Sequence, residues 1–82
     1  MVENKIRQDE IRIGDNVRRI RKSRNIGQTE LVRLLQLQGI DITRETLVKI
    51  ERGSQHIKAT QLRAIRDVLN TSYDELLKRY CE

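Results

Sequence analysis

The segment 28–53 limits what this chain can fold into more than any other stretch, because it predicts two short helices joined by a tight connection. Between the two helices, Gln38-Gly39-Ile40-Asp41 is a turn signal. The apolar positions that define the helix faces are Leu31, Val32, Leu34 and Leu35 in the first helix and Leu47 and Ile50 in the second. Two helices at a steep angle, the second with polar residues on its outer side, fit a helix into the DNA major groove.

The ends of these two helices are also marked in the sequence. Gly27 is an acceptable N-cap for a helix that runs from about Gln28 to Leu37. Thr43 is a good N-cap for the second helix, which stops at Gly53.

Three more helices are expected around this pair. Ile13, Val17 and Ile20 form an apolar stripe of a helix that ends near Arg24. Leu62, Ile65 and Leu69 predict a helix over 59–69. Ser72 and Glu75 form a capping box for a fifth helix, whose apolar residues are Leu76, Leu77 and Tyr80.

Composition agrees with one helical domain. The chain has 82 residues with no Phe, Trp or Pro, so the core must consist of Leu, Ile and Val. We expect the domain to span 13–82. Residues 1–12 form an extension that either lengthens the first helix or remains a loose basic arm with frayed structure.

Charge permits a polyanion partner but does not select one. The net charge is +5, and residues 1–27 hold 8 basic against 4 acidic groups. An ordinary solvated surface explains this excess as readily as a nucleic acid does. Along the second helix of the pair, Arg44 and Lys49 can donate to guanine or phosphate, whereas Glu45 can accept from cytosine or merely pair with its basic neighbours.

Several other classes are disfavoured. Cys81 is the single cysteine and His56 stands alone, so no metal site or other cofactor is expected. No membrane-spanning run, signal peptide or small-molecule site is evident, which favours a cytoplasmic protein. The sequence contains no nucleophile–base pair and no Gly-rich phosphate loop, so an enzyme is not expected.

A family resemblance rests on residues spread over most of the chain. The matching residues are Ile13-Gly14-Asp15-Asn16-Val17-Arg18-Arg19-Ile20-Arg21-Lys22, then Gln28, Glu30-Leu31, Leu47, Ile50-Glu51-Arg52-Gly53 and Ser72-Tyr73-Asp74-Glu75-Leu76-Leu77. Together they resemble the phage-repressor/Cro-like helix-turn-helix family of the XRE type. The resemblance implies an all-α, five-helix, lambda-repressor-like DNA-binding domain whose third helix enters the major groove.

The resemblance also implies roles for particular residues. Arg21, which lies beside the buried stripe and needs a partner, matches one member of a buried salt bridge with Glu51. It implies base contacts by Arg44, Glu45 and Lys49 and phosphate contacts by Gln28 and Thr43. From their residue types and positions we add Val48 as a contact to a thymine methyl, and Arg52 and Lys58 as phosphate contacts. The implied partner is a double-stranded DNA operator. Because so small a domain offers a limited interface, we expect a homodimer on the DNA. Leu76, Leu77 and Tyr80 of the fifth helix either form the dimer surface or close the core.

Three features depart from the family pattern. The connection from Leu35 to Thr43 is about five residues longer than usual, and Arg66 and Val32 stand where small residues are usual.

From the resemblance as a whole we expect a sequence-specific transcriptional regulator, a repressor on a palindromic operator. A protein-interaction module, for example an antitoxin-like one with secondary DNA binding, is the alternative.

Overall fold

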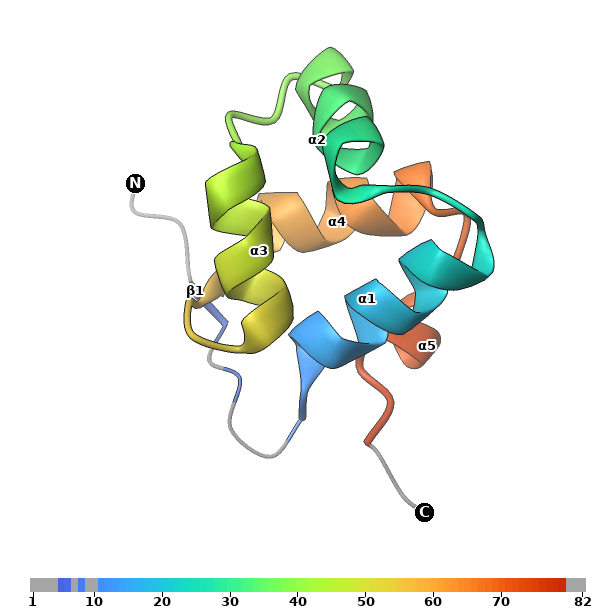
Figure 1. Cartoon of the computed structure of the whole chain (residues 1–82). Coiled ribbons are helices and arrows are strands. Elements are labelled where there is room, and N and C mark those ends of the chain that lie inside the picture. Colours follow the sequence, from blue (N-terminus) through green and yellow to red (C-terminus); the bar gives the residue numbers. More distant parts are fainter. Residues whose placement is uncertain (1–4, 7, 9–10, 80–82) are drawn as a thin grey trace.

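The computed structural model describes residues 5, 6, 8 and 11–79, and within them five helices surround one core (Figure 1). The helices are α1 (Ile13–Ser23), α2 (Gln28–Leu37), α3 (Arg44–Arg52), α4 (Ala59–Val68) and α5 (Tyr73–Leu76). Two short strands, β1 (Lys5–Ile6) and β2 (Ile57–Lys58), pair in antiparallel orientation. The all-α, five-helix fold expected from the sequence is confirmed.

The helix ends follow from the capping residues. The Thr43 hydroxyl accepts a hydrogen bond from the Thr46 N–H at 3.1 Å, and Ser72 accepts one from the Glu75 N–H at 3.2 Å. Gly53 ends α3 in the left-handed conformation with φ of 79°. The predicted start and end of α2 and the predicted caps of α3 and α5 are confirmed.

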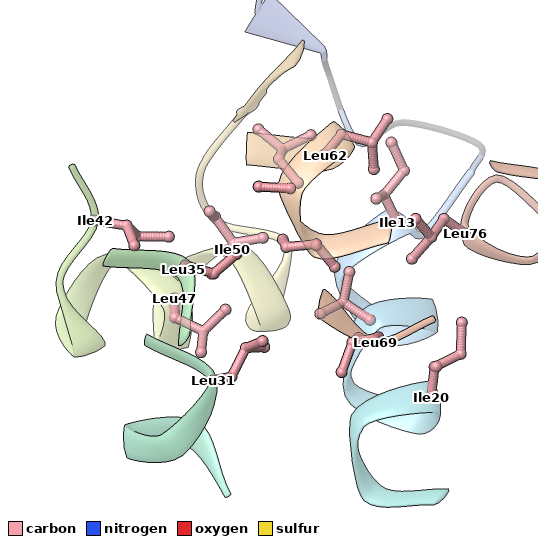
Figure 2. Close-up of a cluster of buried hydrophobic side chains, with 14 of the residues drawn as sticks. Ile13, Ile20, Leu31, Leu35, Ile42, Leu47, Ile50, Leu62, Leu69 and Leu76 are labelled. Atoms are coloured by element: carbon pink, nitrogen blue, oxygen red, sulfur yellow. The ribbon is translucent and has the colours of Figure 1, made fainter. Parts of the chain in front are cut away.

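The helices pack so that α1 and α2 both contact α3, while α4 contacts α2 and α5 contacts α1. In Figure 1, α4 lies behind the first turn of α2. Figure 2 shows aliphatic side chains from all five helices meeting in the core. The buried apolar residues are Ile13, Val17, Ile20, Leu31, Val32, Leu35, Ile42, Leu47, Ile50, Ile57, Leu62, Ala64, Ile65, Leu69 and Leu76. Of the apolar face predicted for α2, Leu31, Val32 and Leu35 are buried and Leu34 is half-buried.

The lengthened connection between α2 and α3 is ordered and contributes to the core. Gly39 has φ of 85°, and the Ile40 N–H donates to the Leu35 carbonyl at 3.1 Å, which closes the end of α2. Ile42 is 2% exposed. The Gln36 amide donates to the Ile42 carbonyl at 2.9 Å and holds the second half of the connection. The extra residues therefore add a buried side chain rather than a free loop.

The N-terminal segment differs from expectation where it is described. Lys5 pairs with Lys58 and Ile6 pairs with Ile57, so these two residues form a strand rather than extending α1 or fraying. Ile6 packs against the core, and Gln8 binds backbone atoms of the domain. A two-residue strand has no recognisable hydrophobic period, which is why the sequence did not predict it.

Two further expectations concern α4 and α5. Arg66 pairs with Asp67 at 2.8 Å, and its guanidinium lies 4.5 Å from the ring centroid of Tyr73. The acidic partner of Arg66 is thus its neighbour in sequence, and the side chain does not enter the core. Of the three apolar residues expected in the fifth helix, Leu76 is fully buried and Leu77 is 37% exposed. The third, Tyr80, lies outside the described residues.

Candidate DNA-binding surface

The outer face of α3 carries the side chains to which we assign base contacts. Leu47 and Ile50 face the core and fix which side of the helix is outward. On the outward side, Arg44, Glu45, Lys49 and Arg52 are exposed and Val48 is half-buried. These charged groups form no ion pair within the described part of the chain. Glu45 therefore does not pair with Arg44 or Lys49, its basic neighbours on α3. The three cations on this face are therefore available to an anionic partner.

A buried ion pair anchors α3 to α1. Arg21 and Glu51 have side chains only 7% and 3% exposed. The Arg21 Nε donates to Glu51 Oε2 at 2.8 Å and its Nη2 donates to Glu51 Oε1 at 3.0 Å, a bidentate geometry. The remaining Arg21 Nη1 donates to the Ile26 carbonyl at 2.8 Å. Because both charges are hydrogen-bonded on several sides, the rotation of α3 relative to α1 is tightly defined.

Gln28 joins this anchor to the first turn of α2. Its side-chain Nε2 donates to Glu51 Oε1 at 3.0 Å. An amide nitrogen carries two hydrogens, so one remains for a phosphate oxygen. The N-cap of α2, Gly27, has no side chain to satisfy the first N–H groups of the helix, which leaves them for an anion. Gln28 therefore connects a potential phosphate position directly to the residue that holds α3.

Thr43 and Lys58 lie beyond the two ends of α3. The Thr43 hydroxyl already serves as the N-cap and also donates to the Thr46 hydroxyl at 3.1 Å, so a phosphate there would have to share it. Lys58 is exposed at the border of an open pocket of about 330 Å³. That pocket is lined by Ser54, Gln55, His56, Lys58 and Gln61.

Two basic residues of α1 were not assigned to a site, and one of them, Arg18, stands beside the residues of α1 that contact α3. Arg18 and Lys22 are exposed, four residues apart, and form no ion pair within the residues described. Arg18 stands one helical turn from Gly14 and from Arg21, both of which contact α3. The signal in the sequence was the like-charged pair at i and i+4, which is unfavourable without an anion nearby.

Other polar residues missed by the sequence reasoning have structural roles. Buried Asn16 donates to the carbonyls of Leu76 and Lys78 at 2.8 and 2.9 Å, which attaches the C-terminal turn to α1. The Arg24 Nε donates to the Leu69 carbonyl at 3.0 Å at the end of α4. No local sequence pattern reveals either contact, because the partner is a backbone atom more than forty positions away.

The described residues include no group of three or more potential metal ligands. Within the same residues, the helices are too short and too polar for any of them to cross a membrane.

These features define the class of protein. Two helices with an anchored, outward-facing second helix, inside a five-helix domain, constitute a helix-turn-helix fold. A comparison with protein families matches the helix-turn-helix family, of the XRE type, over residues 17–76. The chain belongs to this family and is a DNA-binding helix-turn-helix regulator. The family is usually non-enzymatic. A comparison with curated proteins found no significant match.

Proposed function

We propose that this protein is a sequence-specific transcriptional repressor that occupies a palindromic operator with α3 in the major groove. The observation that carries the proposal is the outward face of α3, where Arg44, Lys49 and Arg52 are exposed without an acidic partner in the described chain. The bidentate Arg21–Glu51 pair holds this face rigidly. A rigid helix with free donors is suited to reading base edges.

Each group of residues has a separate task in this proposal. Arg44, Glu45 and Lys49 read base edges, and Val48 offers an apolar contact to a thymine methyl. The phosphate contacts come from Gln28, Thr43, Arg52 and Lys58. Phosphate contacts set the register of the domain on the duplex, and base contacts supply the sequence preference. Repression would follow from occupancy of the operator alone.

Tight binding by so small a domain calls for two copies on DNA. A single module buries a limited area on DNA, and two-fold related modules on half-sites about 10 bp apart add their affinities. We assign the dimer contact to the surface around α5, where Tyr73 and Leu77 are each 37% exposed. Leu76 is excluded from this contact because it is fully buried in the core.

The alternative of a protein-interaction module has one observation in its favour. Leu37, at the end of α2, is 73% exposed, the largest exposure among the large apolar residues described. On α5 the exposed apolar surface is smaller, because the Arg66 guanidinium stacks on the ring of Tyr73. A single exposed leucine is common on monomeric proteins, so the DNA-binding proposal has the stronger support.

The test is selection of bound sites from a random duplex library at two salt concentrations, followed by sequencing. A recovered palindrome, bound more weakly at the higher salt, would support a dimeric operator binder. Recovery of no consensus at either salt concentration would refute sequence-specific binding and leave the interaction module as the better account.

A further inference from the structure

We propose that the N-terminal segment, through Gln8 and β1, is a brace that sets the position of the C-terminal end of α3 and of the loop 53–58. This inference deepens the proposed function, on which its consequence for DNA binding rests. The loop 53–58 leads from α3 to Lys58, and α3 carries the residues assigned to base contacts. A segment that fixes both this loop and the end of α3 therefore determines how well the DNA-binding surface is preorganised.

The side chain of Gln8 makes three hydrogen bonds, all to backbone atoms. Its Nε2 donates to the Ile50 carbonyl at 3.0 Å and to the Gln55 carbonyl at 2.8 Å. Its Oε1 accepts from the Gly14 N–H at 2.6 Å. One amide group thus connects the first turn of α1, the last turn of α3 and the middle of the loop 53–58.

Two of these three backbone atoms lie at helix ends. The Gly14 N–H has no partner within its helix, whereas the Ile50 carbonyl also accepts a hydrogen bond from the Gly53 N–H at 3.0 Å. The Ile50 carbonyl is among the last four of α3, and the Gly14 N–H is among the first four of α1. The N-cap of α1, Arg12, supplies no side-chain hydrogen bond. Gln8 therefore caps the start of α1 and adds a second hydrogen bond to a carbonyl of the last turn of α3, where the α1 backbone lies close to α3. A side-chain carbon built on Gly14 would lie 1.9 Å from the Ile50 oxygen.

The strand pair extends the brace to the end of the loop. Ile6 lies opposite Ile57, and Ile57 is fully buried whereas Ile6 packs against the core. The loop 53–58 is consequently held at Gln55 by Gln8 and at its end by β1. A loop held by an apolar contact and backbone pairing loses freedom before DNA arrives, which lowers the entropy cost of binding.

The brace lies outside the part of the chain that matches the helix-turn-helix family, which begins at residue 17. Gln8, β1 and Gly14 all precede residue 17. The shared domain already contains the buried ion pair and most of the core. We therefore expect variants of Gln8 to remain folded and to change the position of α3 and its loop.

Two substitutions separate the brace from helix capping. Gln8→Ala removes all three hydrogen bonds. Gln8→Glu keeps an oxygen that can accept from the Gly14 N–H, but it places carboxylate oxygens against the carbonyls of Ile50 and Gln55. A control with a similar loss of stability elsewhere is Ser72→Ala, which removes the N-cap of α5.

Amide hydrogen exchange on the full-length, DNA-free protein tests the brace itself. Both Gln8 variants should raise exchange at residues 53–58 by about tenfold relative to wild type, whereas Ser72→Ala should leave this loop unchanged. Wild-type exchange at residues 53–58 in either Gln8 variant would overturn the brace. This outcome is independent of whether the protein binds any duplex.

Binding to the selected duplex and to a scrambled duplex of equal composition tests the consequence. We expect both Gln8 variants to lose about five- to tenfold in affinity for the selected duplex and less than about twofold for the scrambled one. Equal losses on both duplexes, or wild-type affinity with a looser loop, would overturn the link to recognition. Failure of wild type to prefer any duplex would instead refute the proposed function, while the exchange result would still decide the brace.

Discussion

Arg21 and Glu51, thirty positions apart in the sequence, form a bidentate ion pair that is almost completely buried. The carboxylate also accepts a hydrogen bond from Gln28, so one acidic side chain links α1, α2 and α3. No other ion pair among the described residues has both side chains buried. The relative orientation of the three helices that build the candidate site thus depends on Glu51.

Removal of Glu51 should therefore destabilise the whole domain. Glu51→Ala leaves the Arg21 guanidinium buried without its counter-charge, which costs about 3–5 kcal/mol. The measurement is the free energy of unfolding from denaturant titration. The matched control is Glu30→Ala, which breaks an exposed pair with Arg33 and should cost less than about 1 kcal/mol. An unchanged unfolding midpoint for Glu51→Ala would show that the ion pair does not stabilise the fold.

Gly14 should tolerate no side chain, because of its contact with the α3 backbone. A Cβ atom there would lie 1.9 Å from the Ile50 oxygen, so α1 and α3 must move apart. Gly14→Ala should lower the free energy of unfolding by about 3 kcal/mol, the upper part of the range for overpacking. Gly27→Ala is the control, since no atom lies within 4 Å of its added Cβ, and it should cost well under half as much. Equal effects of the two substitutions would contradict the close helix contact.

Much of this fold could be predicted because its signals are local. Thr43, Ser72 and Gly53 mark helix ends through their own side chains or backbone preference, and the structure has those ends as expected. The apolar periodicity of α1 and α4 likewise predicted which residues are buried. The partner of Arg21 came from resemblance to a family, because composition and spacing cannot pair residues so far apart.

The parts that could not be predicted depend on long-range backbone contacts. Gln8 binds carbonyls of residues 50 and 55, and no property of a lone glutamine indicates a distant carbonyl. Ile42 fills the core only because the lengthened connection turns back at Gly39. The pairing of Gln28 with Glu51 was also missed, because its expected role was phosphate binding alone.

Base reading by α3 should be visible as a loss of specificity. Arg44→Ala and Lys49→Ala should each weaken binding to the selected operator by about 1–3 kcal/mol if the contact is bidentate, with a smaller loss on random DNA. The control is Arg63→Ala, which removes one positive charge from an exposed position of α4. Both affinities should be measured at the same salt concentration. Identical losses on operator and random DNA would show that these side chains contact only the backbone.

The proposed dimer contact can be separated from the core by comparing two adjacent leucines. Leu77 is 37% exposed on the surface around α5, whereas Leu76 is fully buried. Leu77→Asp should leave the free energy of unfolding within about 1 kcal/mol of wild type, because a charge is tolerated at a partly exposed position. It should nevertheless abolish cooperative occupancy of two half-sites in a gel-shift titration, since the apolar contact between copies is replaced by repulsion. Leu76→Asp, the control, should unfold the domain by burying an unpaired charge. If Leu77→Asp still fills both half-sites cooperatively, the contact between copies lies on another surface.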